Sequence, residues 1–118
     1  VADSPIGMLI HSEFGLWHAW RGALAFQEKF VLRDCHPVTS PCYTCSEKPC
    51  QTACPVDAFR GGLYDVVECA SHLRTEAGAD CMAQGCRARR ACPVGSDHVY
   101  APAQARFHMN AFLRNQPL

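Results

Sequence analysis

Cysteine is the residue type in this chain that could do chemistry. The chain has nine cysteines among 118 residues, and so high a count in a short chain indicates disulfides, zinc or iron–sulfur clusters. Eight of them form two groups of four: Cys42, Cys45, Cys50 and Cys54, then Cys69, Cys81, Cys86 and Cys92. The repeat predicts two sites, and the spacing within each group decides which chemistry they carry.

Each group of four ends in the same tetrapeptide, Ala-Cys-Pro-Val, at residues 53–56 and 91–94. A [4Fe-4S] cube needs four thiolates. A short loop can wrap three of them around one cube, while a fourth cysteine just before a proline faces a second cube. The proline helps to end the loop, because its ring fixes φ and it lacks an amide hydrogen. We therefore expect two [4Fe-4S] clusters and one-electron transfer.

The stretch from about Pro41 to Val94 resembles the two-cluster bacterial ferredoxins. Its second half looks most like the ferredoxin portion of epoxyqueuosine reductases, and residues 69–76 are similar to that family's cysteine-bearing helix. The resemblance implies a crossed assignment of the thiolates, with Cys42, Cys45, Cys50 and Cys92 around one cluster and Cys54, Cys69, Cys81 and Cys86 around the other.

The spacing departs from the usual C-x2-C-x2-C-x3-C-P motif. Four residues separate Cys45 from Cys50, four separate Cys81 from Cys86, and five separate Cys86 from Cys92. Flexible loop backbone can absorb two added residues and still let the thiolates converge. No corrinoid-binding domain flanks the motifs, so the resemblance implies an electron relay and not the chemistry of the reductase. The whole chain looks closer to ferredoxin-like proteins with a helix before and after the motifs.

Disulfides and structural zinc are the alternatives to clusters for these cysteines. An odd cysteine count, two Cys-Pro signatures and no export signal argue against disulfides. Structural zinc is the stronger alternative, because Cys42-x2-Cys45 is a zinc-like pair, although the other gaps are less typical of zinc sites. Cys35 lies outside both groups and is expected to be an ordinary free thiol. His72 and His98 are expected to support the fold, since eight cysteines already satisfy two cubes.

Composition limits the possible partners. Eleven basic and eleven acidic residues balance, so no net charge recruits nucleic acid. No stretch approaches the roughly 18 apolar residues that span a bilayer, and we expect a soluble, cytoplasmic chain. No nucleophile–base pair or nucleotide-binding glycine motif is present, which favours a carrier between redox partner proteins over an enzyme. The alternatives are a relay subunit of a larger oxidoreductase, a redox sensor and a zinc-binding interaction domain.

Hydrophobic spacing predicts the elements that must position the thiols. Ser12 is expected to cap a helix from Glu13 to about Leu32, with Trp17 and Trp20 packing it onto the domain. Short apolar runs on both sides of Gly61-Gly62 suggest a β-hairpin over residues 57–64. Further helices are expected over residues 66–75, capped by Asp65 and ended by Gly78, and over residues 102–115.

These elements predict an α+β chain: a helix-rich, ferredoxin-like two-cluster domain with a short β-hairpin, flanked by an N-terminal and a C-terminal helix. We expect one compact domain made of an N-terminal helical segment (1–40), a two-cluster core (41–95) and a C-terminal helix (96–118). Arg87, Arg89 and Arg90 lie between two proposed ligands, where they could stabilise a reduced cluster, dock an acidic partner or simply face solvent.

Overall fold

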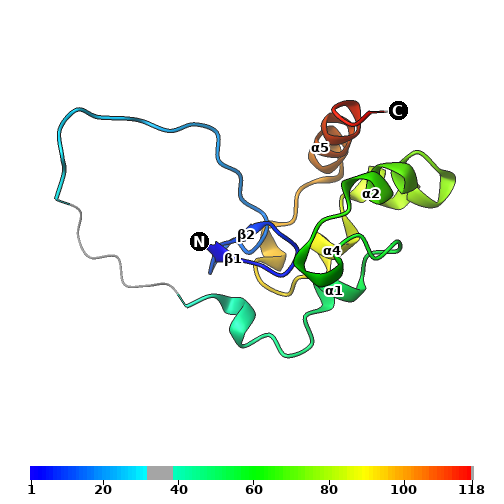
Figure 1. The fold of residues 1–118 in the computed structure, drawn as a ribbon, viewed down its shortest axis with the longest axis horizontal. Helices are drawn as coiled ribbons and strands as arrows, with labels where there is room; N and C mark the ends of the chain where they lie inside the picture. Colours follow the sequence, from blue (N-terminus) through cyan, green and yellow to red (C-terminus); the bar gives the residue numbers. More distant parts are fainter. Residues whose placement is uncertain (32–38, 118) are drawn as a thin grey trace.

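The computed structural model describes residues 1–31 and 39–117. Over these residues the fold is helix-rich with one two-stranded antiparallel sheet, as expected for the α+β class (Figure 1). The strands are β1 (Ala2–Asp3) and β2 (Leu9–Ile10). The α-helices are α1 (Pro49–Thr52), α2 (Val66–Leu73), α3 (Ala79–Gln84), α4 (Arg87–Arg90) and α5 (Pro102–Arg114). The 3-10 turns are η1 (Pro41–Tyr43), η2 (Arg60–Gly62), η3 (Glu76–Gly78) and η4 (Ser96–His98).

The hairpin lies at the start of the chain. β1 pairs with β2 so that Ala2 faces Ile10 and Asp3 faces Leu9. The Met8 carbonyl accepts a hydrogen bond from the Ser4 amide at 3.1 Å, which closes the connecting loop. Ile6 in this loop and Ile10 in β2 are buried in the core. The hairpin thus contributes two of the aliphatic side chains around which the thiol-bearing segments pack.

The predicted N-terminal helix is wrong over the part of it that the structure describes. Residues 13–31 contain no helix, and after Trp17 the chain runs away from the rest of the molecule (Figure 1). Leu16 and Trp17 are buried as expected, but Trp20 is 71% exposed and Phe26 is 61% exposed. An amphipathic helix owes most of its stability to burial of its apolar face. Here that face meets no partner surface.

The hairpin predicted at Gly61-Gly62 is also wrong, although a turn is present. Both glycines have positive φ, 59° and 79°, and they form η2 in place of a two-residue hairpin turn. One backbone hydrogen bond, from the Asp65 amide to the Ala58 carbonyl at 2.7 Å, crosses the loop. The flanking residues then separate: Phe59 is buried in the core and Asp65 caps α2.

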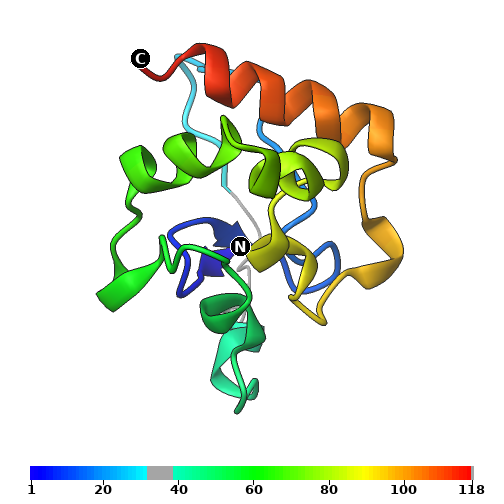
Figure 2. The ribbon, with the colours of Figure 1, turned by 90° about the vertical axis from the view of Figure 1, so that its right-hand side faces the viewer.

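The two later helices confirm the capping and proline signals. The Asp65 carboxylate accepts a hydrogen bond from the Glu68 amide at 2.9 Å and so caps the N-terminus of α2. This helix ends at Leu73, five residues before Gly78. Pro102 begins α5, which runs to Arg114 and buries Ala105. Figure 2 shows α5 lying across α3, the pair of helices with the most extensive packing.

Arg89 of α4 ties three segments together. Its Nε donates a hydrogen bond to the Leu16 carbonyl at 2.7 Å, and its Nη2 donates to the same oxygen. The guanidinium lies 4.5 Å from the centre of the Trp17 ring and 4.6 Å from that of Tyr100. Stacking of a cation between aromatic faces is favourable, the more so when it is shielded from water. The N-terminal segment, α4 and the residues leading into α5 therefore meet at one side chain.

The N-terminal segment also lies against the loop that follows Cys92. A Cβ built on Gly15 would be 1.9 Å from the Val94 carbonyl oxygen, and one built on Gly95 would be 2.4 Å from the Phe14 carbonyl oxygen. Both glycines have positive φ, 56° and 74°. Side chains at these two positions would therefore separate the two backbones.

We expect Gly95→Ala to lower the free energy of unfolding by about 1–3 kcal/mol, because it places a Cβ against backbone at a left-handed position. Gly22→Ala is the matched control, since a Cβ there meets open space. The control should change the stability by less than about 0.5 kcal/mol. Urea unfolding followed anaerobically by circular dichroism measures both. Equal midpoints for the two variants would contradict the close approach.

Candidate metal centre

Two short helices, α1 and α4, pack on each other and carry half of the eight grouped cysteines. Pro49 begins α1, Cys50 follows it, and Cys54 comes two residues after the helix ends. Cys86 directly precedes α4, and Cys92 comes two residues after it ends. The repeat seen in the sequence is therefore also a structural repeat: each half has a short helix with a cysteine at its start and a Cys-Pro just beyond its end.

One cavity, beside the N-terminal hairpin, is lined by three thiols of the first sequence group and one of the second. Its walls include Pro5 and Ile10 from the hairpin region and Lys48 and Val94 from the cysteine loops. The cysteines that line it are Cys42, Cys45, Cys50 and Cys92. Three come from the first half of the chain, and Cys92 reaches across from the end of α4. This is the set that the resemblance assigns to one cluster.

A second cavity, on the side where α2, α3 and α5 lie, is lined by three thiols of the second sequence group and one of the first. Apolar side chains of Phe59, Leu73, Ala88 and Met109 line it. The cysteines in its wall are Cys54, Cys69, Cys81 and Cys86. In this cavity three of the thiols belong to the second half of the chain, and the fourth, Cys54, follows α1 in the first half. The structure brings together both predicted sets of four, while Cys35 lies outside the described residues.

Backbone amides and one phenol face the thiols of the second cavity. The Ala58 amide donates to Cys54 Sγ at 3.3 Å. Burial raises the pKa of the Cys86 thiol, and the Arg89 and Ala88 amides oppose this by lowering it. Burial likewise raises the pKa of Cys69, opposed by the Tyr64 hydroxyl, which donates to its sulfur. Burial also raises the pKa of Tyr64 itself. These donors are placed to stabilise negative charge on sulfur.

The first cavity has the same electrostatic character. Burial raises the pKa of the Cys50 thiol, and the neighbouring Cys92, Cys42 and Cys45 thiols raise it further. Burial also raises the pKa of Cys92, which the Val94 amide opposes. Cys50 and Cys92 are buried and Cys42 and Cys45 are partly buried, so negative charge gathered on these sulfurs needs compensation by a cation. Metal binding supplies that compensation, because it deprotonates the thiols it coordinates.

His72 tests whether the second cavity suits an inorganic cluster. It lies one helical turn after Cys69 on α2 and lines the same cavity. Its Nε2 is buried and has no hydrogen-bond partner among the described residues. A buried polar atom without a partner costs free energy, so with His72 in the tautomer that carries its hydrogen on Nε2 the cavity suits a group that offers a hydrogen-bond acceptor. The sulfides and thiolates of an iron–sulfur cluster are such acceptors. His98, in contrast, is exposed and packs edge-on against Phe14.

Zinc is the alternative metal for these two sets of thiols. A single zinc ion holds its four sulfurs at about 2.3 Å from one point. Within residues 1–31 and 39–117, no three His, Cys, Asp or Glu side chains are arranged to hold one metal ion. In both cavities the four thiols stand around a space together with apolar side chains. Either a single zinc ion or an iron–sulfur cluster would take such an all-cysteine donor set.

The three arginines between Cys86 and Cys92 have different surroundings. Arg87 and Arg90 both bind the Asp80 carboxylate, Arg87 through Nε at 2.7 Å, and these hydrogen bonds help to hold the pKa of Asp80 below its usual value. Arg87 also lines the second cysteine cavity. Arg89 is the stacked residue described above and forms no ion pair within the described chain. Sequence reasoning alone did not separate these roles.

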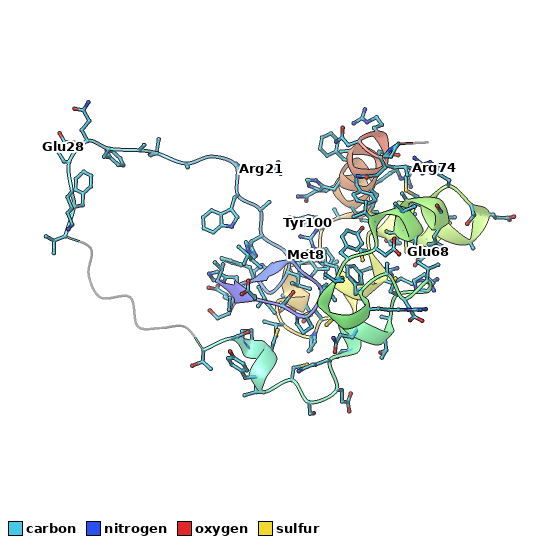
Figure 3. All side chains as sticks on the ribbon, in the orientation of Figure 1. Met8, Arg21, Glu28, Glu68, Arg74 and Tyr100 are labelled. Atoms are coloured by element: carbon cyan, nitrogen blue, oxygen red, sulfur yellow. The ribbon has the colours of Figure 1, made fainter. Side chains whose placement is uncertain are left out.

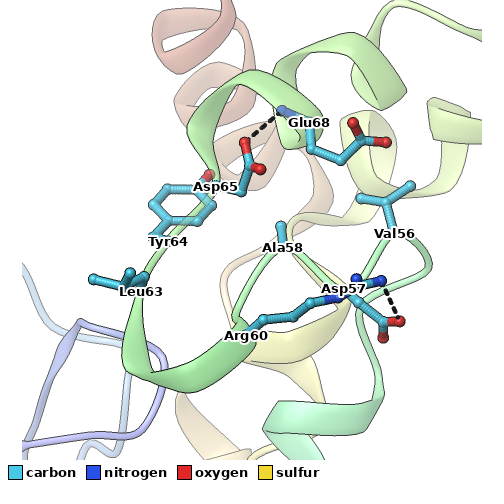
Figure 4. A pocket seen from close by; sticks show the side chains of 8 residues that line it. All are labelled: Val56, Asp57, Ala58, Arg60, Leu63, Tyr64, Asp65 and Glu68. Carbon is cyan, nitrogen blue, oxygen red and sulfur yellow. Dashed lines mark hydrogen bonds and ion pairs between the residues drawn. The ribbon is translucent and has the colours of Figure 1, made fainter.

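A third hollow, of about 520 Å³, lies beside η2 and carries no cysteine (Figure 4). Three of its four charged side chains are already engaged, and the fourth, Glu68, is exposed. The Asp57 carboxylate pairs with Arg60 at 3.0 Å, and the Asp65 carboxylate caps α2 through the Glu68 amide. We therefore assign it no ligand, and the cysteine cavities are the candidate site.

Comparison with known proteins adds no relative: no family model, curated protein or solved structure matches this chain. Within the described residues, no helix has the length and apolar character needed to cross a membrane. The candidate site therefore rests on the positions of this chain's own thiols and on the groups that surround them.

Pairs of cysteine substitutions test the crossing. We expect Cys45→Ala with Cys92→Ala to remove one site and leave about four iron atoms per chain, because both residues line the first cavity. Cys45→Ala with Cys54→Ala should remove both sites, since these residues line different cavities. Iron counting on anaerobically purified, folded protein measures this, with Ser46→Ala in the same loop as control. The reverse ranking of the two double variants would show that each half of the chain builds its own site.

Proposed function

We propose that this chain is a one-electron transfer protein that holds two [4Fe-4S] clusters in a ferredoxin-like arrangement. One observation carries the proposal: two cavities each lined by four cysteines, each taking three from one half of the chain and one from the other. An all-cysteine donor set of this kind is typical of such clusters. A bound cluster would supply the redox chemistry, by gaining or losing one electron.

The chain's own contribution would be to hold the two clusters close together in a dry surrounding. Cys50 and Cys54 are four positions apart along α1 and the residues just after it, about 6 Å at helical rise. Cys86 and Cys92 are six positions apart along α4 and its flanks, about 9 Å on the same measure. Ala88 of α4 is fully buried between them, and Cys50, Cys92 and Phe59 belong to the same core cluster. Little water therefore separates the two sets of thiols.

The first cluster would be the one nearer to a redox partner. Cys45 lies in a loop whose neighbours Tyr43, Ser46, Glu47 and Lys48 are all exposed. The second cavity is instead covered by α2, α3 and α5. Exposure and nearby hydrogen bonds both change the reduction potential of a cluster. The two sites should therefore have different potentials, and electrons would enter or leave through the loop at residues 43–48.

A second candidate function, a relay subunit of a larger oxidoreductase, is favoured by the exposed apolar segment. Over residues 20–31, the side chains of Trp20, Leu24, Phe26, Phe30 and Val31 are all more than half exposed. Large exposed apolar patches mark interaction sites. A subunit should copurify with its partner at native expression levels, whereas a free carrier should elute alone as a monomer.

The metal content tests the proposal directly. We expect about eight iron and eight acid-labile sulfide per chain after anaerobic purification, with an interacting pair of reduced-cluster signals in electron paramagnetic resonance after dithionite. About four of each would leave only one of the two proposed sites. Stoichiometric zinc without sulfide would overturn electron transfer and favour a structural interaction domain.

His72 should tune only one of the two clusters. A hydrogen bond to cluster sulfur favours the reduced, more negative state, so His72→Phe should lower one potential and leave the other unchanged. A tenfold change in the reduction equilibrium corresponds to about 59 mV for one electron, which redox titration resolves. His72→Gln keeps a donor and should restore part of the change, and His98→Phe is the exposed control. An equal fall in both potentials would contradict the placement of His72 at one cavity.

A further inference from the structure

A cavity of about 300 Å³ adjoins the second set of thiols and has no role in holding them together. It lies between the loop of the N-terminal hairpin, Trp17 and one face of α5. Met8 from the hairpin and Tyr100 before α5 both line it, and Figure 3 shows these two side chains near the centre of the molecule. Its volume is at the lower end of the range for small-molecule sites, which suits one or two rings.

Tryptophan, tyrosine and phenylalanine contribute five of the fifteen residues that line this cavity. The Trp17 and Tyr100 rings meet edge to face with centres 5.3 Å apart. Elsewhere in the lining, Tyr64 stacks on Phe59 at 4.8 Å and lies near-parallel to Phe112 at 6.3 Å. Aromatic rings prefer to stack or to meet edge to face with other rings. A flat, apolar ligand would find such partners in this cavity.

The polar groups of the cavity indicate a hydrogen-bond acceptor on that ligand. Arg89 lines it and faces no carboxylate partner in the described part of the chain. The Arg89 side chain has five N–H donors. Its Nε and Nη2 each donate one hydrogen bond to the Leu16 carbonyl, which leaves further N–H groups for a ligand. His108 adds a second polar ring to the lining. With one guanidinium and one imidazole, the cavity suits ring carbonyl oxygens and lacks the cluster of cations that a dinucleotide's phosphates would need.

Two of the residues that line this cavity, Cys69 and Cys86, are also proposed ligands of the second cluster. Both belong to the second set of four thiols. A ligand in the aromatic cavity would therefore lie against two of the proposed ligands of the second cluster, with Tyr64, which donates to Cys69, beside it. Electrons from that cluster would have only the thiolates to cross.

We propose that this cavity binds a planar, conjugated cyclic dicarbonyl compound of the quinone class. Binding itself follows from the cavity, and reduction rests on the proposed function. Two reduced clusters would each lose one electron, and one quinone would take up those two electrons and two protons from solvent to give one hydroquinone. The chain would then pass electrons to a small molecule as well as to proteins.

The test uses duroquinone, whose fully substituted ring resists addition of thiols. Calorimetry on the oxidised, cluster-loaded protein should show saturable binding at one site. Durene, the planar tetramethylbenzene with C–H groups in place of the carbonyls, should bind about tenfold more weakly, because it loses hydrogen bonds from a charged donor. Equal affinity for the two compounds would overturn recognition of the carbonyls, and no saturable binding of duroquinone would overturn the site.

Two neighbouring substitutions locate the binding. Met8→Trp places a large ring in the wall of the cavity and should abolish duroquinone binding. Leu9→Trp is the matched control, since Leu9 is 42% exposed and does not line the cavity. Loss of binding in both variants, or in neither, would overturn the location. Circular dichroism on each variant checks that it is folded.

Iron and sulfide counted on the same samples separate the two proposals. Protein with about eight iron that fails to bind duroquinone would refute the quinone site and leave electron transfer standing. A second outcome is protein that contains no iron or sulfide but still binds duroquinone, with binding lost in the Met8→Trp variant. This outcome would support the quinone site and refute the clusters as its electron donors.

Discussion

The packing of α1 on α4 is the constraint on which the rest of the structure depends. Each helix is only four residues long and would not be stable alone, so each is held by the other and by the core around Ala88. The pair sets the direction in which each Cys-Pro leaves its helix. Cys54 and Cys92 therefore reach across to the opposite cavity. The helix pair fixes the positions of Cys54 and Cys92. The remaining thiols can come from loops of unequal length, because their positions depend less on the two helices.

The core around this pair is assembled from distant parts of the chain. Arg89 binds the Leu16 carbonyl and lies over the Trp17 and Tyr100 rings, while Gly15 and Gly95 let two backbones approach where a side chain would separate them. Both contacts join the N-terminal segment to the region around Cys92. The hairpin and its loop then supply walls to the first thiol cavity and to the aromatic cavity. Residues far from any cysteine thus shape the surroundings of the sulfurs.

Sequence reasoning succeeded where a local rule decides the outcome. Asp65 caps α2 and Pro102 begins α5 because each signal acts within one turn of helix. The assignment of the thiols to two clusters, expected from the cysteine repeat and a resemblance to two-cluster ferredoxins, stays a prediction. The helix predicted from Glu13 failed because its apolar spacing needs a partner surface, which no local pattern can reveal. The Gly61-Gly62 turn was found, but its flanking residues belong to the core and to a helix cap. That the buried Nε2 of His72 has no partner among the described residues depends on tertiary packing, which the local sequence does not show.

The crossing of the two short helices also affects the order in which the protein can mature. On the proposed assignment, neither half of the chain contains a complete ligand set, so cutting it between the halves would leave no fragment with an intact site. During synthesis, the second set of four is complete once Cys86 has emerged. The first, although it begins at Cys42, must wait for Cys92. The site that starts earlier in the chain is thus the last that can be filled, and a nascent chain would hold three committed thiols exposed to oxidation until then.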